Sequence, residues 1–402
     1  MTIFVEKLTN MQPRSILFLH NPRHAPFSYG GIERVTLMLS EWFRSRGIKV
    51  YVVANAVDAD AIPERYRQQV VWLPTPRRKI SYRDYCLHAG ECCRKYDIDL
   101  IICQGGYLRK IDVLRSMTDA PILYCNHSQP FWEVARSLAG YDRFHRHITP
   151  FYHLSRAYKK WKTRRRILRR YRSLYDSVDR YVLLCKGYVG EFCNALGIDA
   201  DRSKAVAIYN PTASAAALPD MSKKQKRLLF VGRLSYADKR IDRLLRVWAR
   251  LQEEFADWSL DIVGDGEERA ELERMAASMS LRRVNFCGAT TDPTPSYEHA
   301  SILCMTSSYE GWGMVIVEAQ QRGVIPVAFD CSAGVHEVID SCGGVLVEPF
   351  DEESYAEALR RLMSSPELRA EHLKRIAACH DLYNIDRIGA QWESLFASIE
   401  RR

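Results

Sequence analysis

The sequence predicts an α/β protein made of two Rossmann-like domains, each built around a parallel sheet. Short apolar runs alternate with amphipathic stretches along the chain, as parallel strands joined by helices do. With 402 residues, the chain is longer than a single hydrophobic core usually supports. The alternation starts again after a polar break at 221–227, which indicates a second domain.

The expected elements follow from these runs. In the first domain a helix is expected over 31–47, and the apolar runs predict strands at 15–20, 48–54, 98–103, 121–127 and 180–185. In the second domain the runs predict strands at 227–233, 258–264, 282–288, 302–307, 324–329 and 344–349. Helical patterns lie between them at 240–256, 267–280, 314–323 and 352–363.

The join between the domains is placed at Asn210-Pro211-Thr212, where proline ends a strand. This gives an N-terminal domain of residues 1–210 and a C-terminal domain of residues 211–384. Ligands of open α/β sheets bind at the carboxyl ends of the strands. Two such domains facing each other would therefore form a cleft lined by both sets of loops.

The composition argues against several other classes of protein. No run of about 18 apolar residues suggests a membrane-spanning helix, and the first residues lack an apolar signal core, so we expect a cytoplasmic protein. The twelve cysteines form no CxxC pair, and those in strand-like runs, such as Cys103 and Cys304, are interpreted as core residues.

The basic residues are concentrated in one segment. Ten lysines and arginines and no acidic residue lie between Arg156 and Arg172, within a net charge of +9 for the chain. A helix over 154–178 would pack one apolar stripe and surround it with cations, which suits an anionic membrane surface. The stripe consists of Leu154, Tyr158, Trp161, Leu168, Tyr171, Tyr175 and Val178.

Contact of 156–172 with the inner face of the plasma membrane is the functional interpretation of this helix. The alternative is a solvated charge run on an ordinary domain helix. Nucleic-acid binding is not expected, because no recognition module accompanies the charge.

The strongest motif runs from Glu310 to Glu318, directly after an expected strand. Its glycines allow close backbone approach, and a helix beginning near Gly313 would direct free N–H groups at a diphosphate. The two carboxylates are suited to vicinal sugar hydroxyls. The alternative is a glycine cap followed by a helix that carries a surface glutamate.

Two cations form a second motif. Arg233 ends the first strand of the second domain, in Val231-Gly232-Arg233-Leu234, and Lys239 follows six residues later. Cations at the carboxyl end of a strand can neutralise charge on a departing diphosphate. The alternative is a pair of solvated surface residues.

Two positions in the first domain complete the pattern. Gly30 and Gly31 open the first helix and permit close approach of a phosphate or an acceptor, but the turn lacks the G-x-G-x-x-G of nicotinamide enzymes. His127 ends a strand and could bind a sugar hydroxyl, or alternatively a loop carbonyl.

Together these segments resemble the retaining glycosyltransferases of family 4, which have the GT-B fold of two Rossmann-like domains facing across a cleft. The match is closest in the second domain. The residues there that match the family's E-x7-E pattern are Ser307, Ser308, Glu310, Gly311, Trp312, Gly313, Glu318 and Ala319. Trp312 stands where phenylalanine is commoner. In this fold a terminal helix, here within 385–402, crosses back to the N-terminal domain.

The resemblance implies a role for each position. Glu310 would hold hydroxyls of the donor sugar, Glu318 would bind the ribose, and the nucleotide base would lie near 287–292. Catalytic roles are implied for Arg233, Lys239, Glu310 and His127. Donor contacts are implied for Gly30, Gly31, Gly264, Gly288, Gly311, Trp312, Gly313, Met314 and Glu318.

The activity implied is transfer of a sugar, with retention of configuration, from a UDP- or GDP-sugar to a glycan or lipid-linked acceptor. Cell-surface polysaccharide or lipopolysaccharide synthesis is the expected process. No cofactor and no metal are expected, since none of the D-x-D triplets, such as Asp97-Ile98-Asp99, follows a strand of the expected cleft. A donor-binding but inactive relative and a GT-B nucleotide-sugar epimerase are the alternatives.

Overall fold

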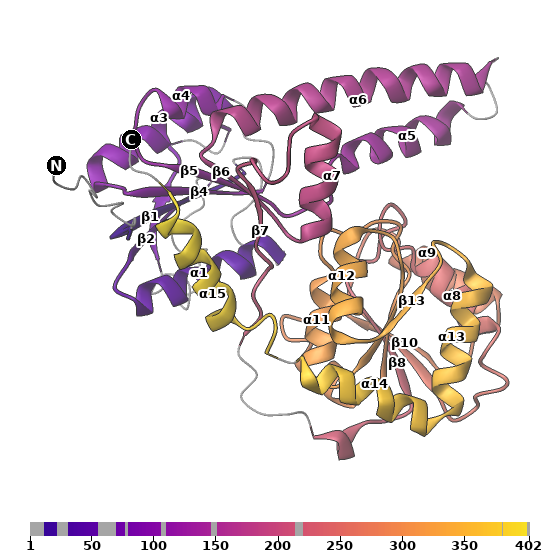
Figure 1. The fold of residues 1–402 in the computed structure, drawn as a ribbon. Coiled ribbons are helices and arrows are strands. Elements are labelled where there is room, and N and C mark those ends of the chain that lie inside the picture. The colour runs from indigo at the N-terminus through magenta and orange to yellow at the C-terminus, as the bar shows by residue number, and fades with distance from the viewer. Residues whose placement is uncertain are drawn as a thin grey trace. The chain divides into compact units, whose positions relative to one another are not determined.

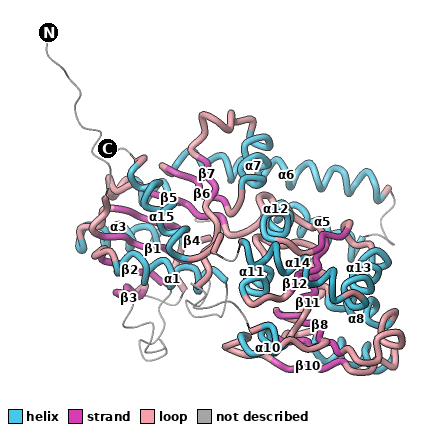
Figure 2. Tube along the Cα trace, turned by 60° about the horizontal axis from the view of Figure 1, so that its bottom comes forward, coloured by secondary structure: helices cyan, strands magenta, loops and turns pink. Residues whose placement is uncertain are grey.

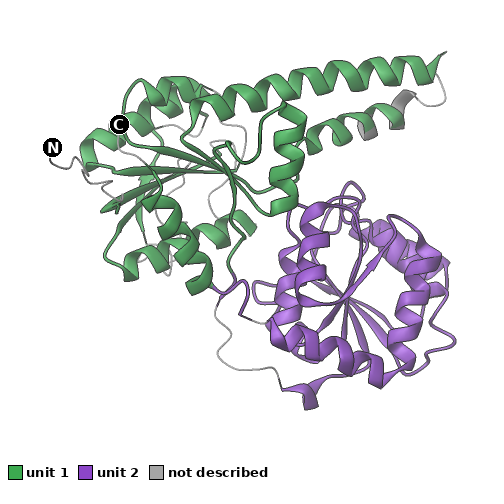
Figure 3. Ribbon diagram, viewed as in Figure 1, with its two compact units in different colours: residues 1–211, 385–402 green, residues 212–384 purple. Residues whose placement is uncertain are grey.

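A computed structural model describes residues 12–21, 31–54, 70–76, 79–105, 110–145, 151–213, 220–379 and 381–399. The chain divides into two compact units (Figure 3): unit 1 comprises residues 1–211 and 385–402, and unit 2 comprises residues 212–384. Each unit contains one parallel sheet flanked by helices (Figure 1). The predicted α/β class with two parallel sheets is confirmed.

The described part of unit 1 contains a seven-stranded sheet of order β3-β2-β1-β4-β5-β6-β7. Its central strands are apolar runs buried on both faces, as expected for strands that helices cover on each side. The strands are β1 (Ser15–His20), β2 (Lys49–Ala54), β3 (Val71–Pro74), β4 (Leu100–Gln104), β5 (Ile122–Asn126), β6 (Arg180–Leu183) and β7 (Ala205–Ala207).

The helices of unit 1 belong to the N-terminal part of the chain, except for α15, which lies near the C-terminus. They are α1 (Gly31–Ser45), α3 (Tyr82–Tyr96), α4 (Ile111–Arg115), α5 (Trp132–His145), α6 (Tyr152–Ser177), α7 (Lys186–Leu196) and α15 (Ile385–Ala397). Helix α15 packs against α1, and the indole N–H of Trp42 donates to Asp386 at 3.2 Å. The rings of Phe43 and Phe396 lie with their centres 5.5 Å apart at a tilt of 42° in the core that these two helices share with the sheet.

Helix α6 runs beside α5 and extends beyond the sheet (Figure 1). The half nearer the sheet is packed, with Tyr171 and Tyr175 buried. The other half differs from the continuous packed stripe that the sequence predicts, because Leu154, Tyr158 and Trp161 are 71%, 60% and 55% exposed. Helical spacing alone does not show where the neighbouring sheet ends.

In the part of the chain that the structure describes, no helix is both long and apolar enough to cross a membrane.

Unit 2 has a six-stranded sheet of order β10-β9-β8-β11-β12-β13 among its described residues, with the strands lying between its helices (Figure 2). The strands are β8 (Arg227–Val231), β9 (Ser259–Val263), β10 (Val284–Gly288), β11 (Ile302–Met305), β12 (Ile325–Phe329) and β13 (Val345–Val347). The α-helices are α8 (Ile241–Ala249), α9 (Arg269–Ser278), α10 (Thr294–His299), α11 (Met314–Gln321), α12 (Ala333–Cys342), α13 (Glu352–Ser364) and α14 (Pro366–Ala378), and a short 3-10 helix covers Met221–Lys223.

The core of unit 2 forms around large side chains that the sheet and α8 bury together. Trp248 and Trp258 are among its largest members, with Phe230, Phe329 and Tyr355 beside them. A fully buried side chain of this size stabilises the fold by roughly 1.5–3 kcal/mol. The predicted strands all lie at or near observed ones, whereas β3 and β7 are short edge strands that the apolar pattern does not reveal.

The packing of α15 on α1 leads to a test. A Cβ atom on Gly389 would lie 2.2 Å from Cε2 of Trp42. We therefore expect Gly389→Ala to lower stability, because overpacking costs about 1–3 kcal/mol and the helix propensity of alanine offsets only about 1 kcal/mol of it. Amide hydrogen exchange over 385–397 should accelerate, and the urea midpoint of unit 1 should fall.

Gly190 in α7 is the matched control, since no heavy atom lies within 4 Å of its added Cβ. Gly190→Ala should leave stability unchanged or raise it by up to about 1 kcal/mol. Equal midpoints for the two variants would contradict the close approach of α15 to Trp42.

Candidate active site

The strand order of unit 2 reverses between β8 and β11, which are neighbours in the sheet but not in the sequence. Ligands of open parallel sheets bind outside the carboxyl ends of the strands at such a reversal. The loops at 232–240 and 306–313 leave the sheet there. They carry both motifs that the sequence singles out in this unit.

An ion pair joins these two loops. Nζ of Lys239 lies 2.6 Å from Oε1 of Glu310, and the side chains are only 20% and 11% exposed. The hydroxyl of Ser307 donates to the same carboxylate oxygen at 2.7 Å. The backbone N–H of Ser308 donates to the carbonyl of Asp238 at 2.7 Å. The loops are thus linked through both side chains and backbone.

The ion pair keeps Lys239 charged. Burial alone would lower the pKa of Lys239, but the charge of Glu310 and the hydrogen bond to it outweigh burial and raise that pKa above its ordinary value. A fixed ammonium group is therefore held at the carboxyl end of β8 over the whole physiological range of pH.

Arg233 is a second cation in the same loop, and it is far more exposed. Its side chain is 68% exposed, and Nη2 donates to Oδ2 of Asp238 at 2.7 Å. Burial tends to raise the pKa of Asp238, but hydrogen bonds from Ser235 and Arg233 outweigh it and hold the pKa below its usual value. The structure therefore links Arg233 to Asp238 and Lys239 to Glu310 at the carboxyl ends of β8 and β11.

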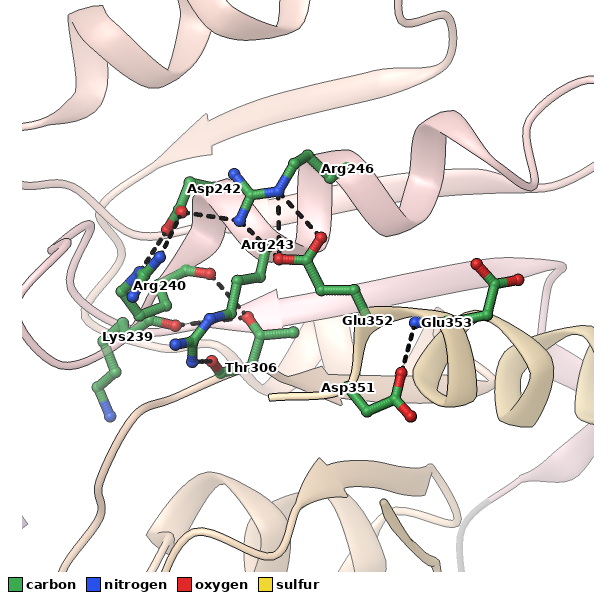
Figure 4. Close-up of polar contacts among 9 residues, drawn as sticks. All are labelled: Lys239, Arg240, Asp242, Arg243, Arg246, Thr306, Asp351, Glu352 and Glu353. Atoms are coloured by element: carbon green, nitrogen blue, oxygen red, sulfur yellow. Dashed lines mark hydrogen bonds and ion pairs between the residues drawn. The ribbon is translucent and has the colours of Figure 1, made fainter. Parts of the chain in front are cut away.

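A network of charges fixes the start of α8, just after Lys239 (Figure 4). Arg240 has a left-handed backbone conformation with φ of 52° and donates to both carboxylate oxygens of Asp242. Arg246 contacts Asp242 at 3.1 Å and Glu352 at 2.6 Å, which connects α8 to α13. Because two helices anchor it, the loop that carries Lys239 has a defined position.

Arg243 connects the same helix to β11. It is only 8% exposed, its Nη1 donates to the carbonyl of Thr306 at 3.3 Å, and its guanidinium lies 4.2 Å from the ring centre of Phe350. This contact sets the position at which the 306–313 loop leaves the strand (Figure 4).

The 311–314 segment leads into α11. Gly313 has a φ of 75°, a left-handed conformation that favours glycine, and Met314 begins the helix. The indole of Trp312 is covered, because the residue is only 2% exposed and packs edge-on against Tyr383 with ring centres 5.3 Å apart. Gly311 and Met314 are partly exposed, so a ligand at this turn could contact them directly.

Glu318 lies further inside α11. It is 5% exposed, and its Oε2 accepts a hydrogen bond from the hydroxyl of Tyr297 at 2.9 Å. Its carboxylate is thus held in place by a residue of α10.

Gly264 is explained by close backbone packing, and Gly288 by its left-handed backbone conformation with φ of 78°. A Cβ on Gly264 would lie 1.8 Å from the carbonyl oxygen of Gly232, so only glycine fits there. The N–H of Gly264 donates to the carbonyl of Gly288 at 2.8 Å. These contacts support the loop that carries Arg233.

Unit 1 places its candidate residues at the corresponding reversal, between β1 and β4. Gly30 lies outside the described residues, and Gly31 is the first residue of α1. His127 follows β5, and its Nε2 is hydrogen-bonded to Oε1 of Gln104, the last residue of β4. His20, the last residue of β1, lies close enough to His127 for that residue to influence the pKa of His20.

Both histidines are neutral near pH 7. Burial lowers the pKa of His127 to about 4, and burial together with the neighbouring His127 lowers the pKa of His20 to about 4. Because the amide oxygen of Gln104 only accepts hydrogen bonds, Nε2 of His127 carries the proton and Nδ1 is an acceptor.

The sequence-based prediction did not include Asp238, Gln104 or Tyr297. Asp238 directly precedes Lys239 and could have been considered. Gln104 and Tyr297 can be identified only from the structure, because each contacts a candidate residue of a different element. No group of three or more potential metal ligands occurs among the residues that the structure describes.

Comparison with known proteins identifies both halves of the chain. Residues 29–213 match a family model described as Glycosyltransferase Family 4, and residues 219–377 match one described as Glycosyl transferases group 1. Together the two models cover most of the sequence.

Among curated relatives, an uncharacterized glycosyltransferase of Haemophilus influenzae is 34% identical over 43% of this chain and 49% of its own length. The amylovoran biosynthesis glycosyltransferase AmsD of Erwinia amylovora is 36% identical over 37% of this chain and 41% of its own length. The chain thus spans about half or less of the length of these relatives.

Among solved structures, HepE of Anabaena in complex with UDP superimposes with a TM-score of 0.73. The alignment covers 96% of this chain and all of that one at 17% identity, so it demonstrates a common fold.

The neutral histidines predict how the stability of unit 1 depends on pH. The unfolded chain takes up protons near the ordinary histidine pKa of 6.5, but the folded chain does so only near 4. The stability that the two neutral histidines contribute is therefore fully present above pH 6.5. It is lost as the pH falls from 6.5 towards 4. We expect a loss of at least about 1 kcal/mol, measured by urea unfolding across this range.

His127→Gln should reduce this acid-dependent loss. His336→Gln is the control, because a hydrogen bond to Asp330 raises the pKa of His336 and gives it the opposite pH dependence. An identical pH profile for wild type and His127→Gln would show that His127 is not held neutral by the fold.

Proposed function

Because the chain belongs to the group 1 glycosyltransferases of GT-B fold, we propose that it transfers a sugar from a nucleotide diphosphate donor. The observation that carries the proposal is the grouping of Arg233, Lys239 and Glu310 at the strand reversal of unit 2. It combines two cations for a diphosphate with a carboxylate for sugar hydroxyls.

The two cations have different parts in the proposal. Lys239 is a largely buried point charge that anchors one phosphate oxygen, and Arg233 is an exposed planar group whose several N–H donors can bind two phosphate oxygens at once. Their charge stabilises the diphosphate as the bond to the sugar breaks. Glu310 accepts hydrogen bonds from the sugar hydroxyls, and the buried Glu318 accepts them from the ribose.

The donor is proposed to be a UDP- or GDP-sugar. The likeness to a fold that binds UDP in HepE supports a nucleotide of this class. The free N–H groups at the start of α11 and the turn at Gly311 suit the diphosphate, while the loop after Gly288 is assigned to the base.

The reaction is proposed to retain the configuration of the donor sugar and to need no metal. The anomeric carbon loses its bond to the phosphate oxygen and gains one to the acceptor oxygen on the same face, while the leaving phosphate takes the acceptor proton. Unit 1 is assigned to the acceptor side, and its neutral His127 is proposed to accept a hydrogen bond from a hydroxyl of the donor sugar.

The acceptor is proposed to be a glycan or a lipid-linked sugar in cell-surface polysaccharide or lipopolysaccharide synthesis. Similarity to AmsD, named for amylovoran biosynthesis, and to the lipopolysaccharide glucosyltransferase WaaG of Escherichia coli supports this process. A donor-binding inactive relative would bind nucleotide without transfer, and an epimerase would convert the donor without an acceptor.

Contact with an anionic membrane through 156–172 is proposed as well. Leu154, Tyr158 and Trp161 are exposed on the outer half of α6, beside a run of lysines and arginines. Exposed aromatic and aliphatic side chains flanked by cations are typical of helices that lie in the interface of anionic membranes. Such contact would bring a lipid-linked acceptor to unit 1 at the inner face of the plasma membrane.

The donor site is tested by calorimetric binding of UDP, GDP and their sugars with EDTA present. One nucleotide should bind the wild type, Glu318→Ala should weaken its binding, and Arg233→Ala should lower kcat by about 100-fold through loss of leaving-group stabilisation. NMR of the product should show the anomeric configuration of the donor.

Lys226→Ala is the control for loss of one cation from the same unit, since Lys226 pairs with Asp257 beside the opposite, amino-terminal ends of the strands. Its kinetics should match those of the wild type. Nucleotide binding that is unaffected by Glu318→Ala, together with turnover unaffected by Arg233→Ala, would refute the proposed site.

Membrane contact is tested by flotation with vesicles of phosphatidylglycerol or phosphatidylcholine. Binding should require the anionic lipid, and replacing Tyr158 and Trp161 with serine should weaken it at unchanged charge. Met221→Ser is the control, because Met221 is an exposed apolar residue of unit 2. Equal recovery with both lipids, or no effect of the double substitution, would contradict the assignment.

A further inference from the structure

Asp238 occupies the centre of the charged group in unit 2. Its Oδ2 accepts from the guanidinium of Arg233 at 2.7 Å, and its Oδ1 accepts from the backbone N–H of Lys239 at 3.1 Å. Its own carbonyl accepts from the backbone N–H of Ser308 at 2.7 Å. Asp238 therefore contacts the guanidinium of Arg233, the backbone of Lys239 and the loop that carries Glu310.

The two sides of the Arg233 pair are unequally fixed. The side chain of Asp238 is 16% exposed and is held by several hydrogen bonds, whereas that of Arg233 is 68% exposed. An arginine side chain carries about 2 kcal/mol of rotamer entropy, which an exposed residue retains unless a partner restrains it. The carboxylate is thus the fixed member of the pair, and it determines where the guanidinium points.

Arg233 can bind Asp238 and a phosphate at the same time. A guanidinium has five N–H donors, and Nη2 of Arg233 is the group that contacts Asp238. The remaining donors can face the oxygens of a diphosphate. The carboxylate of Asp238 would also repel the phosphate bound by Arg233. Asp238 therefore orients Arg233 but lowers the affinity for the nucleotide.

We propose that Asp238 is a positioning residue that orients Arg233 towards the departing diphosphate and, through its negative charge, weakens binding of the nucleotide. This rests on the proposed glycosyl transfer and deepens it. The benefit comes in the transition state, where charge develops on the leaving group, while the repulsion acts on donor and nucleoside diphosphate product alike. A weaker hold on the product also favours its release.

Asp238→Asn separates the two effects. The asparagine oxygen can still accept a hydrogen bond from the N–H of Lys239. The NH2 group of the asparagine then faces Arg233, and because both groups are donors they form no hydrogen bond. We expect kcat to fall about 10-fold or more, and UDP, or GDP if that is the nucleotide bound, to bind several-fold more tightly than to the wild type. Asp257→Asn is the matched control, because Asp257 is an exposed carboxylate paired with Lys226.

A double-mutant cycle identifies the route of the effect. If Asp238 acts through Arg233, Asp238→Asn should cause no further loss of kcat in an Arg233→Ala background. Arg233→Lys, which keeps the charge but loses the planar fork, should reproduce the loss of kcat if Asp238→Asn folds poorly. Additive losses, or an affinity of Asp238→Asn for the nucleotide that is no tighter than that of the wild type, would overturn the proposal.

One readout does not depend on turnover. Relaxation of the Arg233 Nε–H signal in NMR should report an ordered side chain in the wild type and a mobile one in Asp238→Asn, without nucleotide. An equally mobile Arg233 in both proteins would refute the positioning role even if the enzyme transfers sugar. An ordered Arg233 in a wild type that binds no nucleotide would instead refute the proposed function.

Discussion

The ion pair between Lys239 and Glu310 is the interaction on which the site in unit 2 depends. It joins the 232–240 and 306–313 loops, which leave the sheet at neighbouring strands but lie far apart in the sequence. Partial burial strengthens the attraction between the charges and makes an unpaired charge costly, so neither loop can move without the other. Ser307 and the network from Arg240 to Glu352 reinforce the same geometry.

The two units use one topological feature in different chemical ways. At the strand reversal of unit 2 the protein groups charged side chains, whereas at that of unit 1 it groups His20, Gln104 and His127 in neutral form. Charged groups suit an ionic ligand such as a diphosphate, and neutral acceptors and donors suit hydroxyl groups. The sheets are alike, and the contrast comes from the residues placed at their carboxyl ends.

The sequence predicted the buried central strands well, because a continuous apolar run of a few residues has few other interpretations. Edge strands such as Ala205–Ala207 are too short to show a pattern. Helical periodicity placed Trp161 and Tyr171 on one stripe, but only the extent of the sheet decides which of them is covered. Gln104 escaped notice because its partner His127 comes from another strand, whereas Asp238 lies in the same loop as its partner Arg233 and could have been found from the sequence.

The discontinuity of unit 1 has a consequence for synthesis. Its sheet is complete by β7, yet the face of α1 around Trp42 receives α15 only after the whole of unit 2 has been translated. Since domains generally fold as units during translation, unit 2 can assemble while the apolar surface of α1 is still bare on the ribosome. The emergence of α15 is then the event that covers this surface, and until it emerges the surface is open to chaperones and to aggregation.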